Sequence, residues 1–183
     1  MTYITNNITI SFFGHSNIFN ISGVRKRLLV CVEEKIRQGA NRFLVGVHGH
    51  FDQLALSVCE ELKQKYDIEI CLVFTTLTIL KEKQDVARDL FGDNIKPTTY
   101  DIENTHFKNT ITYTNHKMID DSDFVICYVD EKISRSGAKN AMKYAKRNKK
   151  RYINLYEETD EPFYRMTNEE KEKAFKKFLK KDS

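Results

Sequence analysis

The sequence between residues 42 and 62 reads RFLVGVHGHFDQLALSVCEEL and shows the pattern on which the fold depends. Its first part, RFLVGV from 42 to 47, is a short apolar run typical of a buried strand. From Asp52 to Tyr66, apolar residues recur at helical spacing, which predicts a helix. Between these two segments lies a loop that contains glycine. The stretch is therefore a strand, a loop and a helix in succession.

The same alternation continues in both directions along the chain. Before residue 42 we predict a strand at 8–13 (ITISFF) and a helix from an N-cap at Ser22 to a stop at Gly39. After residue 66 we predict strands at 68–74, 124–129 and 152–156, and helices at 80–91, 111–121 and 138–148. Residues 92–109, which include Pro97, are expected to form a long irregular loop.

Strands that alternate with helices imply right-handed crossovers and a parallel sheet. We therefore expect an α/β fold with a mostly parallel sheet of about five or more strands and helices on both faces. With 183 residues, the chain has the length of one domain, which we place at 1–156. Residues 157–183 are expected to form a helical extension that opens with a capping box at Thr167 and Glu170 and packs on the domain.

Composition excludes several classes of protein. No apolar run approaches the roughly 20 residues that a membrane helix needs, and the N-terminus lacks the features of a secretory signal, so we expect a cytoplasmic protein with no membrane partner. The four cysteines stand singly in apolar segments and are interpreted as core residues, with a catalytic thiol as the alternative. Residues 139–183 hold 14 Lys/Arg against 8 Asp/Glu, but no aromatic residues alternate with the basic ones, and we do not expect nucleic-acid binding.

Three loops that contain glycine follow predicted strands and lead toward helices. In an open parallel sheet such loops meet at the carboxyl edge, where ligands bind. Glycine allows close approach of the backbone, and the start of a helix offers free N–H groups to phosphate. The candidate ligand-binding residues in these loops are Gly14, His15 and Ser16; Gly46, His48, Gly49, His50, Phe51 and Asp52; and Ser134, Arg135, Ser136, Gly137, Ala138 and Lys139.

Within this site we expect the backbones of Gly14, Gly49 and Gly137 to face phosphate, and Asp52 and Asn115 to hold a sugar or a base. The amide of Asn115 can both donate and accept, as recognition of a base edge requires. Each glycine could instead serve only the geometry of its turn, and Asp52 could be only an N-cap.

The sequence does not indicate a metal or a bound cofactor. The three histidines of these loops, His15, His48 and His50, have no ligand-like spacing, and neither GxGxxG nor GxxxxGK[ST] occurs. The acidic residues at 120, 121 and 123 precede a strand and are interpreted as solvated, although a carboxylate pair could serve a glycosidic reaction.

Four segments together resemble the SLOG superfamily, and most closely its YpsA-like branch of standalone proteins. They are FFGHS at 12–16, FLVGVHGHFDQLAL at 43–56, TNHKMIDDSDFVICYV at 114–129 and SGAKNAMKYAKRNKKRYINL at 136–155. The resemblance covers about residues 8–156. It implies a Rossmann-like sheet, frequent dimerisation, and a pocket for nucleotides or their derivatives, including ADP-ribose-type signals.

The same superfamily contains the LOG enzymes, which hydrolyse the N-glycosidic bond of adenine nucleotides. Their PGGxGTxxE signature is degraded here to SRSGAKNAM, without the catalytic glutamate. Ser16 and Thr114 stand where the YpsA-like branch often has arginine. We therefore expect a protein that binds a nucleotide or a nucleotide derivative (an ADP-ribose-like or cyclic-nucleotide signal), as a sensor or in sequestration and as a homodimer. The alternatives are an N-glycoside hydrolase or transferase using Asp52 or Asp120, and an interaction protein acting through its C-terminal helix.

Overall fold

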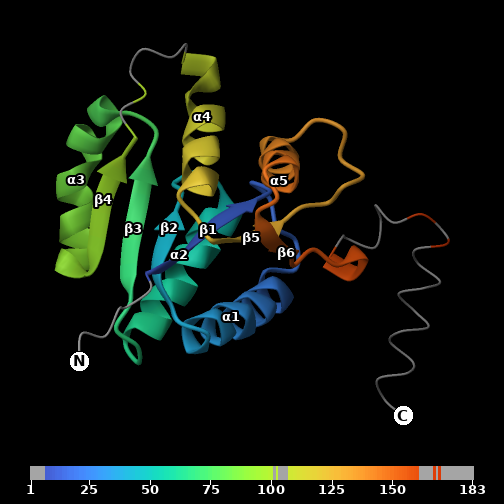
Figure 1. Cartoon of the computed structure of the whole chain (residues 1–183), viewed down its shortest axis with the longest axis horizontal. Helices are drawn as coiled ribbons and strands as arrows, with labels where there is room; N and C mark the ends of the chain where they lie inside the picture. Colours follow the sequence, from blue (N-terminus) through green and yellow to red (C-terminus); the bar gives the residue numbers. More distant parts are fainter. Residues whose placement is uncertain (1–6, 101, 103–106, 161–166, 168, 170–183) are drawn as a thin grey trace.

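The computed structural model has an α/β architecture built on a six-stranded, all-parallel sheet (Figure 1). It describes residues 7–100, 102, 107–160, 167 and 169. The strands are β1 (Ile8–Gly14), β2 (Ala40–Val45), β3 (Glu69–Phe74), β4 (Ile95–Thr99), β5 (Phe124–Tyr128) and β6 (Arg151–Asn154), in the order β4-β3-β2-β1-β5-β6. The helices are α1 (Ile21–Arg37), α2 (His50–Lys63), α3 (Leu77–Phe91), α4 (Phe107–Asp120) and α5 (Gly137–Arg147), with two short 3₁₀ turns, η1 (Gly92–Asn94) and η2 (Glu158–Asp160).

The two faces of the sheet carry separate apolar clusters, because side chains alternate along each strand. In the central strand β1, Ile10 and Phe12 join a cluster with residues of α1, α2 and α3. Phe13 points to the other face and joins a cluster with residues of α4 and α5. The prediction of a parallel sheet with helices on both faces is confirmed.

The strand order reverses at β1, and this reversal positions the site. β1 pairs with β2 on one side and with β5 on the other. The connections from β1 to β4 step outward in one direction, and the chain then crosses to the far side of β1 through α4. A crevice opens at such a switch point, outside the carboxyl ends of the two strands.

The prediction of an irregular loop at 92–109 is wrong, because β4 lies within it. Within the described residues, this strand forms the edge of the sheet and pairs only with β3, with Pro97 opposite Leu72. An edge strand bonds on one side only and therefore tolerates proline, which cannot donate. Lys96 and Pro97 are also residues that discourage an edge from pairing with another chain.

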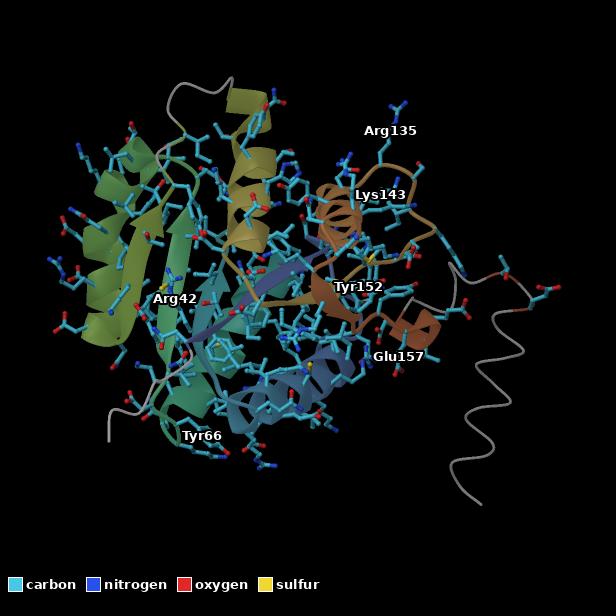
Figure 2. All side chains as sticks on the ribbon, viewed as in Figure 1. Arg42, Tyr66, Arg135, Lys143, Tyr152 and Glu157 are labelled. Carbon is cyan, nitrogen blue, oxygen red and sulfur yellow. The ribbon has the colours of Figure 1, made fainter. Side chains whose placement is uncertain are left out.

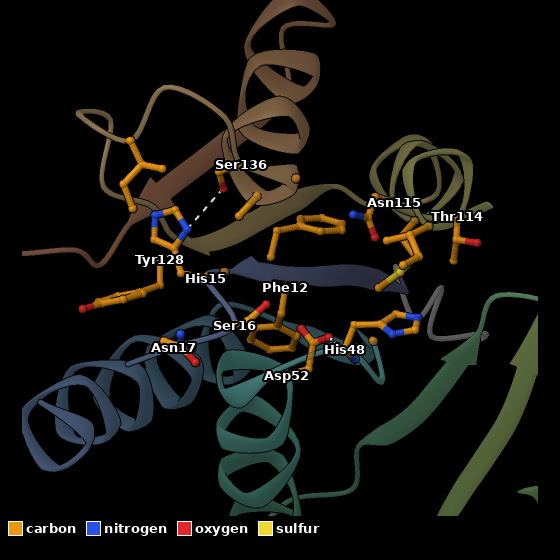
Figure 3. A pocket seen from close by; sticks show the side chains of 18 of the residues that line it. Phe12, His15, Ser16, Asn17, His48, Asp52, Thr114, Asn115, Tyr128 and Ser136 are labelled. Atoms are coloured by element: carbon orange, nitrogen blue, oxygen red, sulfur yellow. Dashed lines mark hydrogen bonds between the residues drawn. The ribbon is translucent and has the colours of Figure 1, made fainter. Parts of the chain in front are cut away.

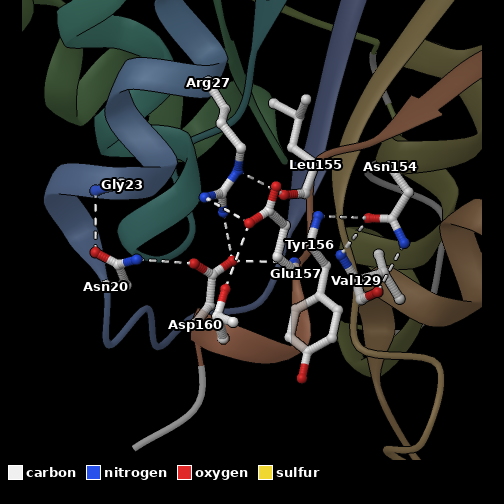
Figure 4. A network of polar contacts seen from close by, with 10 residues as sticks. Asn20, Gly23, Arg27, Val129, Asn154, Leu155, Tyr156, Glu157 and Asp160 are labelled. Carbon is white, nitrogen blue, oxygen red and sulfur yellow. Dashed lines mark hydrogen bonds and ion pairs between the residues drawn. The ribbon is translucent and has the colours of Figure 1, made fainter. Parts of the chain in front are cut away.

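The prediction of Ser22 as the N-cap of α1 is wrong, because the N-cap is Asn20. The Asn20 side chain accepts a hydrogen bond from the Gly23 N–H at 3.0 Å and donates one to Asp160 Oδ1 at 3.0 Å (Figure 4). Asp160 is buried and also pairs with Arg27, whose Nε donates to the Leu155 carbonyl at 3.1 Å. Residues 155–160 are thereby fastened to the start of α1. The helix predicted beyond residue 166 lies outside the described residues.

Replacing Asp160 with Ala is expected to lower the free energy of unfolding by about 2 kcal/mol. The change leaves the Asn20 amide and Arg27 without their shared acceptor, but Arg27 is still 24% exposed, so the loss is below that for a fully buried ion pair. Urea denaturation measures the change. Glu158→Ala is the matched control, since it removes an exposed ion pair with Lys132 and should cost less than about 0.5 kcal/mol. Equal effects of the two substitutions would contradict the prediction.

All four cysteines are buried and free, as their interpretation as core residues requires. Cys31 and Cys59 belong to the cluster under α1, α2 and α3, and Cys71 and Cys127 to the cluster under α4 and α5. Burial raises the pKa of each thiol. Among the described helices, none is both long enough and apolar enough to cross a bilayer.

Candidate functional site

A cavity of about 440 Å³ lies at the carboxyl ends of β1 and β5, where the strand order reverses (Figure 3). Its walls come from the ends of these strands, the loop after β2, α4, and the start of α5. The three predicted loops therefore reach one space. Of the candidate residues, those that line the cavity are Gly14, His15, Ser16, Gly46, His48, Asp52, Asn115, Arg135, Ser136, Gly137 and Ala138.

Five candidate residues do not line the cavity: Gly49, His50, Phe51, Ser134 and Lys139. Phe51 is fully buried, and its ring stacks on Tyr128 at 5.8 Å between centroids. Lys139 directs its ammonium group to the carbonyls of Glu131 and Ile133, so it closes the β5–α5 loop. The structure does not bring these five residues to the cavity wall, and their contact with a ligand stays a prediction.

The structure gives Gly14 and Gly49 a packing role, and the predicted contact of their backbones with phosphate stays a prediction. A Cβ added at Gly14 would lie 2.5 Å from Cβ and Cδ1 of Phe51, so the glycine allows α2 to pack against β1. Gly49, the N-cap of α2, has φ 104°, and a Cβ there would lie 2.8 Å from the Cα of Ser16. Gly137 differs from both, because no atom of the described residues lies within 4 Å of its added Cβ.

The start of α5 presents hydrogen-bond donors to the cavity. The first N–H groups of a helix lack partners within the helix, and the helix dipole makes this end positive. Ser136 is the N-cap, and its Oγ accepts from the Lys139 N–H at 3.3 Å. Gly137 and Ala138 follow as the first helical residues and also line the cavity. Their arrangement suits an anion.

His15 stands between β5 and Ser136. Its Nε2 accepts a hydrogen bond from the Asp130 N–H at 2.8 Å, and its Nδ1 lies 3.2 Å from Ser136 Oγ (Figure 3). Burial lowers the pKa of His15, although the nearby Asp130 carboxylate opposes the shift. The ring is therefore neutral at physiological pH and has one donor and one acceptor nitrogen.

Asp52 brings a buried carboxyl group to another part of the cavity wall. It lies in the first turn of α2, and its Oδ2 accepts from the His48 N–H at 2.8 Å. A Cβ at Gly46 would come within 2.6 Å of the same oxygen, so the glycine leaves room for this carboxyl group. Burial raises the pKa of Asp52 to about 7, and the hydrogen bond from His48 opposes the shift. The N-cap of α2 is Gly49, which excludes the N-cap role for Asp52.

Helix α4 contributes more of the wall than we predicted. Thr114 lies beside the expected Asn115, is 3% exposed, and has no hydrogen-bond partner for its hydroxyl among the described residues. A buried hydroxyl without a partner costs about 1–3 kcal/mol, which a water or ligand group reaching it from the cavity would relieve. The sequence carried a signal for this wall, because the spacing of Ile111, Thr114, Asn115 and Met118 places them on one helix face.

The remaining lining residues that we did not predict are mainly apolar or aromatic. Three of them, Phe19, Ile111 and Ile133, are 44%, 43% and 40% exposed and come from three different segments. Apolar and aromatic walls with a few polar groups are typical of sites for organic ligands. The others are Phe12, Phe13, Asn17, Val73, Met118 and Tyr128.

The acidic residues before β5 lie at the opposite, amino-terminal edge of the sheet. Asp120 accepts from the Tyr144 hydroxyl at 3.0 Å, Asp121 from the Tyr100 hydroxyl at 2.9 Å, and Asp123 from the Thr9 N–H at 2.8 Å. Asp120 does not line the cavity, so the cavity gives no support to the glycosidic role considered for it, and Asp52 is the one carboxylate among the lining residues described. In the described part of the chain, no three His, Cys, Asp or Glu side chains are grouped as a metal would require.

A scan of the chain against protein-family models finds no match, and a search of curated proteins finds none.

Proposed function

We propose that this protein binds a nucleotide or a nucleotide derivative, such as an ADP-ribose-like or cyclic-nucleotide signal, and acts as a sensor or in sequestration. The observation that carries the proposal is that the start of α5 and the polar residues of α4 line the same cavity. Phosphate would lie against Ser136, Gly137 and Ala138, and a sugar or base against Asn115 and Asp52. The SLOG-like motifs support the same ligand class, with a cytoplasmic homodimer as the proposed form.

Two features of the cavity support an organic ligand with an anionic end. The apolar rim of Phe19, Ile111 and Ile133 offers surface on which a flat base could pack. The unpartnered hydroxyl of Thr114 adds a polar group for a sugar or base. Ser136 and Asn115 stand apart in the view into the cavity, as a ligand with two different ends requires (Figure 3).

The proposal is tested by thermal shift with a panel of ligands at fixed ionic strength. The panel contains adenosine and guanosine mono-, di- and triphosphates, their 3′,5′-cyclic monophosphates, and ADP-ribose. A ligand present at 100 times its Kd stabilises the folded state by about 2.7 kcal/mol, which is readily seen as a rise in Tm. No rise with any member at millimolar concentration would refute the proposal.

Replacing Ser136 with Ala is expected to weaken binding of the tightest member of this panel by about 10- to 100-fold, the worth of one hydrogen bond to a charged group. The substitution also removes the N-cap of α5, which costs about 1 kcal/mol of stability. Isothermal titration calorimetry measures the affinity.

Thr76→Ala is the matched control for Ser136→Ala. Thr76 caps α3 in the same way, accepting from the Ile79 N–H at 3.2 Å, and it does not line the cavity. Both substitutions should lower stability by a similar amount, and only Ser136→Ala should lower affinity. Unchanged affinity in Ser136→Ala would remove the start of α5 from the binding site.

Asp52 supports a second candidate function, an N-glycoside hydrolase or transferase. A buried carboxyl with a pKa of about 7 suits general acid or base catalysis at neutral pH. The alternative requires release of a free base from a nucleotide, which chromatography detects. Turnover that is lost in Asp52→Asn while binding persists would favour this function over binding alone.

A further inference from the structure

We infer that His15 is a positioning residue that fixes the Ser136 hydroxyl as a hydrogen-bond donor into the cavity. The inference deepens the proposed function and rests on it, because it states what kind of group the start of α5 accepts. That group is a deprotonated oxyanion, which accepts hydrogen bonds and donates none. Two hydrogen bonds reach the His15 ring, one at each nitrogen.

The first hydrogen bond fixes the tautomer of His15. A backbone N–H can only donate, so the 2.8 Å contact from Asp130 N makes Nε2 the acceptor nitrogen of the ring. The proton of the neutral ring is then on Nδ1. A protonated ring would place Nε2–H against the Asp130 N–H, and burial of the ring also disfavours the charged form.

The tautomer then fixes the polarity of Ser136. With its proton on Nδ1, His15 donates to Ser136 Oγ across 3.2 Å. The same oxygen accepts from the Lys139 N–H at 3.3 Å, so both of its lone pairs are occupied. Its own hydrogen has no acceptor among the described residues and remains available to a ligand. Ser136 lines the cavity, so the hydroxyl joins the Gly137 and Ala138 amides as a third donor.

Three donors grouped at one end of the cavity select the ligand group by hydrogen-bond polarity. A phosphate or other ionised oxyanion matches all three, and these charge-assisted hydrogen bonds are about twice as strong as neutral ones. A hydroxyl or amide at the same place would present a donor to a donor. Lys139 adds no charge here, because its ammonium group is bonded to backbone carbonyls, whereas Arg135, whose side chain extends outward in Figure 2, lines the cavity.

The tautomer is read directly by ¹⁵N-edited NMR of the histidine rings in the full-length protein. We expect His15 to carry its proton on Nδ1 both with and without the tightest nucleotide of the panel. A ring that is protonated on Nε2, or doubly protonated at pH 7.5, would overturn the inference and leave the proposed function intact. A merely structural histidine need not keep this tautomer.

Affinity is then measured for His15→Phe, Ser136→Ala and the double substitution. If His15 acts through Ser136, each single substitution lowers affinity by about tenfold or more, and the double one lowers it no further than Ser136→Ala alone. Losses that multiply would overturn the inference, because they would show independent roles. Affinity unaffected by either single substitution would instead refute the placement of the anion at α5.

His15→Gln is the variant that should retain binding. One amide offers an acceptor oxygen to the Asp130 N–H and a donor nitrogen to Ser136, which are the two roles of the ring. On a logarithmic scale of affinity, we expect His15→Gln to recover at least half of the affinity that His15→Phe loses, when the two variants have equal thermal stability. Gln and Phe variants that are equally impaired, with Asp130 N–H still protected from hydrogen exchange, would count against a role in hydrogen-bond polarity.

Discussion

Replacing Asp52 with Asn is expected to raise the free energy of unfolding at pH 8 by about 4 kcal/mol relative to the native chain, and to have little effect at pH 4. Burial raises the pKa of this carboxyl from 3.8 to about 7. The folded state then binds more protons than the unfolded state between these two values. Stability therefore falls as pH rises through this window, and the amide removes that loss. Urea denaturation of both proteins from pH 4 to 8 measures it.

The amide can still accept the hydrogen bond from the His48 N–H, so the comparison isolates the charge. Asp85→Asn is a suitable control, because its side chain is 77% exposed on α3. It should change the free energy of unfolding by less than about 0.5 kcal/mol at pH 8. A difference between Asp52→Asn and the native chain that stays constant from pH 4 to 8 would show that the folded carboxyl titrates normally.

Replacing Gly14 with Ala is expected to lower the free energy of unfolding by about 3 kcal/mol, at the upper end of ordinary overpacking. The added Cβ would lie 2.5 Å from two atoms of Phe51, which is fully buried. Phe51 cannot move away easily, because it packs on Tyr128. Either β1 or the first turn of α2 must shift. Chemical denaturation measures the loss, and the cavity beside Gly14 should distort with it.

Gly137→Ala is the control for this substitution, because its added Cβ meets open space. It should change stability by less than about 1 kcal/mol. Combining Gly14→Ala with Phe51→Leu should recover part of the loss, since the smaller side chain vacates the contested volume. If Gly14→Ala lowers the free energy of unfolding no more than Gly137→Ala does, α2 does not pack closely against β1 at Gly14.

The buried strands could be predicted from the sequence because parallel strands covered on both faces are continuous apolar runs. β1, β3 and β5 all show this composition, and their predicted bounds agree with the observed ones to within a residue or two. β4 could not be predicted in this way. An edge strand with one partner needs neither β-branched residues throughout nor a full set of donors, and IKPTT therefore resembles a loop.

The site was predictable at the level of its loops and less so at the level of its side chains. Parallel topology alone brings the loops after β1, β2 and β5 to one edge. Which residues face inward depends on turn geometry that a single sequence does not encode. Gly49 packs against Ser16 and does not line the cavity. The hydrogen bond from the Asp130 N–H to His15 joins residues that are 115 positions apart in the sequence.

The four buried thiols can report on local unfolding of this protein. An alkylating reagent can reach them only when the surrounding packing gives way, because none is more than 7% exposed. Cys59 lies beneath one layer of helices and Cys127 beneath the other. Comparing the alkylation rates of Cys59 and Cys127 in the native chain would show whether the helix layers on the two faces of the sheet unfold together or separately.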